Sequence, residues 1–361
     1  MSDMISIIVP TYNESKTIES LLHRIHTVLS DHSYEIVIVD DDSPDGTARV
    51  AESMRAKFPV KSVVRKDKKG LATAVVEGLN HVSGSRVVVM DADLQHPPEA
   101  IVKLVDEIAN GADIAVASRY VPGGKVPGLN CIRKLVSRGA TRIAHLMLPQ
   151  SRAVKDPMSG FFAFRHRIVK NVELNPVGFK ILLEILTQGR YEKAVEVPIT
   201  FGERSGGESK LDIHQQLEYL KHVTSLMGRS GELRRFLTFC AVGFSGVFVN
   251  LGMLWLFTEI AGLFYIASAA IGIEISIISN FLLNNYFTFS DRREGGVVGL
   301  FKRLFRFNAI SLAGVGVNLL ILWVFTSCIG FHYMVSNCFG IATATIWNYL
   351  ANNWWTWAKY V

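Results

Sequence analysis

Cysteine is scarce in this sequence. Four cysteines occur in 361 residues, and no two of them have CxxC spacing. Structural zinc sites and disulfide-stapled domains both depend on cysteines that are paired or clustered at short intervals. The sequence therefore indicates neither a zinc site nor a disulfide framework.

Charged side chains are missing from long stretches of the C-terminal part of the chain. Residues 236–258 form a run of 23 residues without a charge, which is enough to cross a bilayer as a helix. Three similar stretches follow, and only Glu274 interrupts them with a charge. A carboxylate is costly in lipid, so we expect Glu274 to face other helices. We predict an integral membrane protein with four spans, at about residues 236–258, 263–283, 307–328 and 334–351.

Lys and Arg are also missing from the two short loops near Gly262 and Gly330. The basic residues instead flank the opposite ends of the spans, at Arg234, Arg235, Arg292, Arg293, Lys302, Arg303, Arg306 and Lys359. A membrane surface explains this placement, and the formal net charge of +6, better than a nucleic acid does. The positive-inside rule then predicts that the N-terminal domain lies in the cytoplasm.

The membrane half repeats itself at an offset of 68 residues, without a gap. The matching pairs are Asn250 with Asn318, Trp255 with Trp323, Phe257 with Phe325, Thr258 with Thr326, Asn280 with Asn348, Asn284 with Asn352, Asn285 with Asn353, and Thr288 with Thr356. Each repeat holds two spans, so both repeats enter the membrane in the same orientation. This pattern predicts two helical hairpins related by a pseudo-two-fold axis along the membrane normal.

The first 120 residues alternate short β-rich runs with helical stretches, which predicts an α/β fold. The expected strands are 5–10, 34–40, 60–65, 86–91 and 112–118. Open sheets of this type bind ligands at the carboxyl ends of their strands. We assign residues 1–210 to this domain, 211–232 to an amphipathic helix and linker, and 233–361 to the membrane domain.

Two of the expected strands run into acidic segments. The first segment, Asp40 to Thr47, could bind a ligand, although aspartates in such positions also form turns and helix caps. In the second, alternation along an extended segment would point Asp91, Asp93 and Gln95 to one side. Such hard oxygen ligands suit Mg²⁺ or Mn²⁺ and leave positions open for a diphosphate. The sequence therefore predicts a divalent metal held by these three residues.

Seven motifs resemble those of the family 2 glycosyltransferases with the GT-A (Rossmann-like) fold, and within them the dolichol-phosphate mannose synthases. The match covers roughly residues 4–212. The motifs are VPTYNE (9–14), DDDSPDGT (40–47), DADLQ (91–95), SRY (118–120), SRGA (137–140), SGF (159–161) and GESKL (207–211).

The resemblance implies roles for individual residues. The nucleobase and ribose pocket would be lined by Pro10, Tyr12, Glu14, Val39 and Asp41. Asp91 and Ala92 would contact the nucleotide-sugar, while Asp93 and Gln95 would carry the metal. By motif position, Arg204 and Lys210 are further nucleotide-sugar candidates. The catalytic set is then Asp91, Asp93 and Arg119.

The acceptor implied by the resemblance is a lipid phosphate. A phosphomonoester has its second pKa near ~6, so it is already an oxyanion at neutral pH and needs cations more than a general base. We expect Arg119, Arg133 and Ser137 to bind it. Apolar residues recur at helical spacing over 129–147, with Arg133 and Ser137 at the boundary of the apolar face. This helix and a second amphipathic stretch, 213–227, either lie at the membrane interface or pack on their own domain.

The leading hypothesis is inverting transfer of mannose from GDP-mannose to dolichyl or another polyprenyl phosphate, giving dolichyl β-D-mannosyl phosphate on the cytoplasmic face without an obligatory protein partner. The nearest alternative uses UDP-glucose and undecaprenyl phosphate. A processive polysaccharide synthase is disfavoured, because the chain lacks the QxxRW motif. The four-helix repeat also resembles the GtrA-like membrane family, so a lipid-sugar flippase role for the membrane domain stays open.

Overall fold

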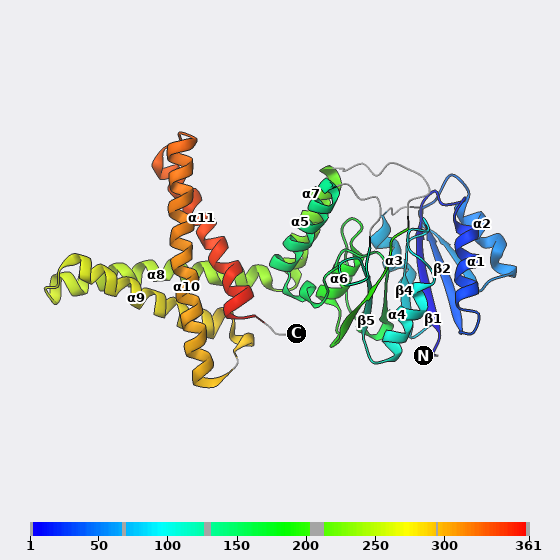
Figure 1. The fold of residues 1–361 in the computed structure, drawn as a ribbon, viewed down its shortest axis with the longest axis horizontal. Coiled ribbons are helices and arrows are strands. Elements are labelled where there is room, and N and C mark those ends of the chain that lie inside the picture. Colours follow the sequence, from blue (N-terminus) through cyan, green and yellow to red (C-terminus); the bar gives the residue numbers. More distant parts are fainter. Residues whose placement is uncertain (1–2, 67–69, 126–130, 203–212, 294, 359–361) are drawn as a thin grey trace. The chain divides into compact units, whose positions relative to one another are not determined.

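The computed structural model describes residues 3–66, 70–125, 131–202, 213–293 and 295–358. The chain forms two compact units, residues 1–230 and residues 231–361. Figure 1 shows an α/β fold in the first unit and long helices in the second. The expected order, an α/β domain followed by a helical domain, is confirmed.

The first unit is built on a seven-stranded sheet with the order β3-β2-β1-β4-β6-β5-β7. β6 runs antiparallel to both of its neighbours, and the other strand pairs are parallel. The strands are β1 (Ile5–Thr11), β2 (Tyr34–Asp40), β3 (Val60–Val64), β4 (Arg86–Val89), β5 (Ile114–Ser118), β6 (Phe162–Arg165) and β7 (Ala194–Pro198). The five strands expected from the sequence are present, and β6 and β7 are additional.

Helices cover both faces of the sheet because strand residues alternate between two apolar cores. Ile7 and Val9 of β1 face α1, α2 and α4, whereas Ile8 between them faces α3 and α6. The helices of this unit are α1 (Ile18–Val28), α2 (Thr47–Ser53), α3 (Leu71–Leu79), α4 (Ala100–Ala109), α5 (Cys131–Met147), α6 (Ile181–Gln188) and α7 (Ile213–Arg229), with short 3₁₀ turns at Met54–Ala56, Pro149–Ala153 and His166–Ile168.

Helices α5 and α7 pack against each other and against α6. Ala144 of α5 and Val223 of α7 share one apolar cluster with Leu183 of α6, and the Tyr219 hydroxyl donates to the Ala140 carbonyl oxygen at 2.6 Å. Both helices also keep large apolar side chains at the surface, at Leu135, Ile143, Leu146, Leu217 and Leu220. One face of each helix thus packs on its own domain, and the location of the exposed face at a membrane interface stays a prediction.

The second unit contains two helical hairpins. Its elements are α8 (Glu232–Trp255), α9 (Tyr265–Leu283), α10 (Gly296–Trp323) and α11 (Tyr333–Ala351), with π-helical turns at Leu256–Ile260, Asn284–Thr288, Val324–Cys328 and Asn352–Thr356 and a 3₁₀ turn at Ser290–Arg292. In the described part of the chain, three helices are long and apolar enough to cross a membrane: Glu232–Ile260, Tyr265–Thr288 and Gly296–Cys328. Helix α11, which carries several Asn, Ser and Thr residues, is not among them, so the fourth span stays a prediction.

The 68-residue repeat is present in the structure. The bounds of α11 are those of α9 shifted by 68 residues, and the two π-helical turns of the second repeat are shifted from those of the first by the same number. The packing inside each hairpin repeats as well: a Cβ on Gly246 would lie 2.4 Å from the Asn280 amide, and a Cβ on Gly314 would lie 2.5 Å from the Asn348 amide. Small residues let membrane helices approach closely, and each hairpin uses the same Gly–Asn contact.

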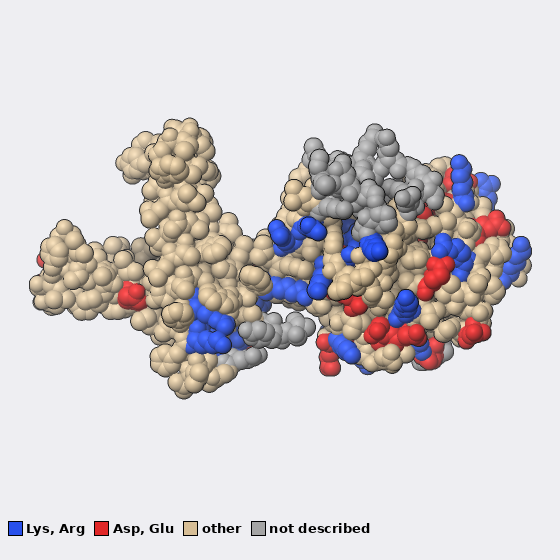
Figure 2. Space-filling view, in the orientation of Figure 1, with Lys and Arg blue, Asp and Glu red and all other residues tan. Residues whose placement is uncertain are grey.

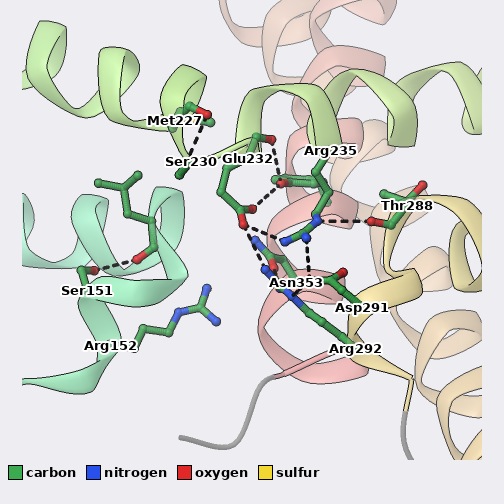
Figure 3. A network of polar contacts seen from close by, with 12 residues as sticks. Ser151, Arg152, Met227, Ser230, Glu232, Arg235, Thr288, Asp291, Arg292 and Asn353 are labelled. Carbon is green, nitrogen blue, oxygen red and sulfur yellow. Dashed lines mark hydrogen bonds and ion pairs between the residues drawn. The ribbon is translucent and has the colours of Figure 1, made fainter. Parts of the chain in front are cut away.

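Charged residues in the second unit gather near the base of the hairpins. The buried carboxylate of Glu232 accepts from Arg235 at 2.7 Å and from Arg292 at 3.0 Å, and Figure 3 shows both arginines directed toward it. On the face in Figure 2, Lys and Arg gather toward the beginning of α10, and the hairpin tips show none. Glu274 lies at the surface of the unit, where its Oε2 accepts from the Asn308 amide of the other repeat at 3.2 Å.

Candidate active site

The loops that follow β1 and β2 are joined by hydrogen bonds. The backbone N–H groups of Asn13 and Ser15 donate to Ser43 Oγ and Asp45 Oδ2, at 2.9 and 3.0 Å. Burial acts to raise the pKa of Asp45, but hydrogen bonds from Thr47 and Ser15 outweigh it and lower this pKa to about 2. Asp40 is buried and accepts from Ser43 Oγ at 2.6 Å. For Asp40 and Asp45, the turn-forming role of the acidic motif is therefore the one observed.

Asp41 lies between these two and has a different environment. Its carboxylate accepts from the guanidinium of Arg65, with a Nε–Oδ1 distance of 2.8 Å, and from the backbone N–H of Gly70 at 2.7 Å. Arg65 also donates to Thr73 Oγ1 at 3.0 Å. The sequence did not point to Arg65, which directly follows β3. Its charge fixes Asp41 at the carboxyl edge of the sheet.

The other residues predicted to bind the nucleotide differ in how far their side chains are exposed. Tyr12 is 50% exposed. Glu14 is partly buried and accepts from Thr17 Oγ1 at 2.6 Å. Pro10 and Val39 are buried, and the Val39 side chain belongs to the apolar core. Any contact of Val39 with a ligand would therefore use its backbone.

The backbone conformation of the predicted metal segment, residues 91–95, differs from the extended one that was expected. β4 ends at Val89, and residues 91–95 bend instead of continuing as a strand. Leu94 has a φ of 62°, a left-handed conformation that is strained for a leucine. The prediction that simple alternation aligns Asp91, Asp93 and Gln95 was therefore wrong in its geometry. The turn is held by the Gln95 N–H, which donates to Asp93 Oδ1 at 3.1 Å.

His96 holds this turn through a hydrogen bond and through ring packing. Its Nδ1 accepts from the Asp91 N–H at 3.0 Å, so the proton of the neutral ring is on Nε2, which lies 3.7 Å from Asp91 Oδ2. The ring stacks on Phe161 and meets Phe201 edge-on. Burial lowers the pKa of His96 to about 4, so the ring is neutral at physiological pH. His96 was missed from the sequence, although it directly follows the DADLQ motif.

Two glycines pack closely against the predicted metal segment: a Cβ on Gly160 would lie 3.2 Å from Asp91 Oδ2, and a Cβ on Gly202 would lie 3.2 Å from the Leu94 carbonyl oxygen. The donor set of two carboxylates and one amide oxygen fits Mg²⁺ or Mn²⁺. Within the described ranges, no group of three or more His, Cys, Asp or Glu side chains could hold a metal ion. The predicted set differs from such a group because it uses the amide oxygen of Gln95.

Arg119 follows β5 and pairs with a fully buried carboxylate. Its Nε and Nη2 donate to the two oxygens of Asp156, both at 2.7 Å. The guanidinium carbon lies 5.1 Å from the centre of the Phe201 ring, and this ring also meets His96 edge-on. Phe201 therefore packs between the predicted metal turn and the predicted phosphate-binding arginine. Asp156 was not predicted, because its partner lies 37 positions away in the sequence.

Ser137 of α5 also lies next to the segment that carries Arg119. Its Oγ lies 2.8 Å from the hydroxyl of Tyr120, the residue after Arg119. The side chain of Arg133, and all of Arg204 and Lys210, lie outside the described residues. Ala92 is buried beside Asp91.

Backbone strain is concentrated at this edge of the sheet. Among the described residues, four that are not glycine have positive φ, and three of them lie in the loops after neighbouring strands: Asn13 after β1, Asp42 after β2 and Leu94 after β4. Strained backbone of this kind clusters at active sites and ligand clamps. The strand ends that sequence reasoning selected are thus the strained ones.

Comparison with known proteins agrees with this geometry. The chain matches the glycosyl transferase family 2 model over residues 6–172 and the GtrA/DPMS transmembrane domain model over residues 238–357. The first unit has the fold of glucosyl-3-phosphoglycerate synthase from Mycobacterium tuberculosis, solved in complex with Mn²⁺, UDP and phosphoglyceric acid. The TM-score is 0.50 at 20% identity, covering 64% of this chain and 79% of that one. The chain is a family 2 glycosyltransferase with a GT-A fold and a helical membrane domain.

Its relatives place it more narrowly. The dolichol-phosphate mannosyltransferase of Pyrococcus furiosus is 48% identical over 98% of this chain and 99% of its own length. The enzyme of that name from Saccharomyces cerevisiae is 34% identical over 68% of this chain and 96% of its own length. The chain belongs to the dolichol-phosphate mannosyltransferase family.

Proposed function

We propose that this enzyme transfers mannose from GDP-mannose to dolichyl or another polyprenyl phosphate, on the cytoplasmic face of a membrane. The observation that carries the proposal is the similarity to the Pyrococcus furiosus enzyme, which spans the catalytic and the membrane unit alike. Further support comes from Asp41, Asp91, Asp93 and Arg119, which follow β2, β4 and β5 of one sheet, since two phosphate-bearing substrates need a metal site and positive charge close together.

The donor lies at the ends of β1, β2 and β4. Tyr12, half of whose surface is exposed, offers its ring to the base, and Pro10, Glu14, Asp41 and the backbone of Val39 complete the pocket. Asp91 and Ala92 contact the nucleotide-sugar, and Arg204 and Lys210 contribute positive charge. A divalent cation held by Asp91, Asp93 and Gln95 would neutralise the charge that develops on the departing diphosphate. The Mn²⁺ in the structurally similar synthase supports such a cation.

The acceptor phosphate lies beside Arg119. Two donor atoms of the Arg119 guanidinium are occupied by Asp156, which orients its remaining N–H groups. Ser137 of α5 lies next to this arginine through the Tyr120–Ser137 contact, and Arg133, on the same helix in the sequence, is proposed as a further phosphate ligand. The exposed leucines of α5 and α7 rest on the membrane surface, so that the lipid tail remains in the bilayer.

The reaction is a single displacement. A phosphate oxygen of the acceptor forms a bond to the anomeric carbon while the bond from that carbon to the diphosphate breaks, and the bonding electrons leave with the diphosphate. The acceptor is already an oxyanion, so no proton has to be removed. The anomeric configuration therefore inverts.

A substrate panel tests the proposal. Full-length protein in membranes is offered labelled GDP-mannose or UDP-glucose, each with dolichyl phosphate or undecaprenyl phosphate. We expect transfer from GDP-mannose. Transfer from UDP-glucose alone would replace the proposal by the alternative donor pair. Protease access to residues 1–230 in sealed right-side-out and inverted vesicles tests the cytoplasmic orientation.

A further inference from the structure

Lys180 lies at the entrance to α6, close to the centre of the active site. Its Nζ donates to the Met158 carbonyl oxygen at 3.2 Å and lies 4.2 Å from the centre of the Phe179 ring. Neither the motifs nor the family resemblance pointed to it. The signal in the sequence is weak, because a lysine before an apolar helix is usually a surface residue.

The Met158 carbonyl group that accepts from Lys180 belongs to a short loop, and two other residues of this loop contact site residues. Asp156, two residues before Met158, is the buried partner of Arg119. Gly160, two residues after it, faces the carboxylate of Asp91. The loop that holds the Lys180 ammonium therefore also contacts Arg119, proposed for the acceptor phosphate, and Asp91, proposed for the metal and donor.

The charges of these groups differ in how they are compensated. The positive charge of Arg119 is matched by the carboxylate of Asp156, so the pair together is neutral. In the described part of the chain, no carboxylate lies within 4 Å of Lys180 Nζ. A phosphate beside Arg119 would thus meet a net positive charge because of Lys180.

Electrostatics agree with this position. Burial lowers the pKa of Lys180 most, the Arg119 guanidinium adds to this effect, and Asp156 and then Asp91 oppose it; together these causes bring the pKa to about 8. Arg119 and Asp156 thus influence the ammonium more than Asp91 does. A phosphate anion bound nearby would favour the charged ammonium.

We propose that Lys180 binds the acceptor phosphate, donating from Nζ to a phosphate oxygen that Arg119 also contacts. This inference rests on the proposed function. Lys180 transfers no proton: it positions the attacking oxyanion and reduces its repulsion from the diphosphate of the donor. The residue is therefore a phosphate ligand and not a general base.

The test measures binding of geranyl phosphate, a short isoprenyl monophosphate, to the full-length protein in detergent without any donor. Geraniol, which lacks the phosphate, serves as the ligand control. We expect Lys180→Met to weaken geranyl phosphate binding about tenfold, or ~1.4 kcal/mol, and to leave geraniol binding unchanged. Lys180→Arg should retain most of the affinity. Lys170→Met, at an exposed lysine, is the matched control and should bind like the wild type.

Binding of GDP by the same variants shows whether Lys180 contacts the acceptor phosphate or the donor diphosphate. We expect GDP affinity to change less than twofold in Lys180→Met, and the thermal midpoint to stay within a few degrees. Equal binding of geranyl phosphate by Lys180→Met and wild type would overturn the inference, as would a selective loss of GDP binding, which would place Lys180 at the donor diphosphate. The geranyl phosphate readout needs neither donor nor sugar transfer, so a wrong choice of donor in the substrate panel would not affect it.

Discussion

Phe289 and Trp357 occupy equivalent positions in the two membrane repeats, and their rings stack on each other with centroids 4.4 Å apart and an interplanar angle of 8°. Equivalent residues can touch in this way only where the axis that relates the repeats passes between them. The Trp357 indole N–H also crosses to the first repeat, donating to Asn285 Oδ1 at 3.2 Å. In the opposite direction, Arg292 donates to Asn353, the repeat equivalent of Asn285, as Figure 3 shows.

This contact makes Trp357 a stability determinant of the membrane unit. We expect Trp357→Phe to keep the stack and lose the hydrogen bond, which costs about 1 kcal/mol. Trp357→Ala should cost about 3–5 kcal/mol, because it removes a fully buried ring. Thermal unfolding in detergent measures both. Trp354→Ala, at a ring that is 66% exposed, is the control, and equal effects of the two alanine variants would contradict the expectation.

The buried Arg119–Asp156 pair should matter far more than an exposed pair of similar geometry. Asp156→Ala leaves the guanidinium without its partner, and we expect it to destabilise the protein by about 3–5 kcal/mol and to abolish most transfer. Arg24 and Glu99 form a comparable bidentate contact at the surface, so Glu99→Ala should change stability by less than about 1 kcal/mol. Chemical denaturation compares them.

Metal removal should stop transfer. We expect Asp93→Ala, and excess EDTA on the wild type, each to lower the initial rate by at least 100-fold, because the diphosphate would leave without charge compensation. Adding Mg²⁺ or Mn²⁺ back should rescue the chelated wild type but not the variant. Full activity in excess EDTA would rule out the metal assignment.

Direct displacement fixes the stereochemistry of the product. From an α-linked donor we expect a β-linked mannosyl phosphate, which NMR of the purified lipid product distinguishes from the α-anomer. A mixture of anomers, or a trapped glycosyl-enzyme, would require a different mechanism.

The junction between α6 and α7 should be sensitive to acid. His222 is fully buried, and its Nδ1 accepts the Val177 N–H at 3.0 Å. Burial lowers the pKa of His222, the nearby Glu184 opposes this shift, and Arg229 adds to it. The unfolded state therefore binds the proton more readily, so the free energy of unfolding should fall as the pH drops below about 6.5, by at most about 1.4 kcal/mol per pH unit.

Thermal midpoints between pH 5 and pH 8 measure this dependence. His222→Asn, which keeps a hydrogen-bond acceptor near Nδ1, should reduce the slope below pH 6.5. His32→Asn, at an exposed position, should leave it unchanged. An identical slope in the His222 variant would show that the acid sensitivity arises elsewhere.

The sheet and the repeat were predictable because both follow from local pattern. β-Branched runs marked β1, β2 and β4, of which the last two lead into aspartates, and the constant offset marked the hairpins. β6 and β7 were not predicted, since short segments such as Phe162–Arg165 have no clear alternation. Their places in the sheet depend on pairing with strands that are distant in the sequence.

The site was predictable where one motif carries several polar residues, and not where the fold brings single residues together. Asp156 reaches Arg119, and Arg65 reaches Asp41, only after the sheet has formed. The bend at Leu94 was missed because a leucine in a sequence gives no sign of a positive φ. In the fold, His96 and Gly202 pack around this turn.

The two repeats are alike inside each hairpin and unlike where the hairpins meet. Each hairpin has the same Gly–Asn packing, but the links between hairpins use unlike donors, Trp357 in one direction and Arg292 in the other. The symmetry of the unit is therefore kept within the hairpins and broken at their junction. A substitution at Gly246 has a counterpart at Gly314, whereas a substitution at Trp357 or Arg292 has no equivalent in the other repeat.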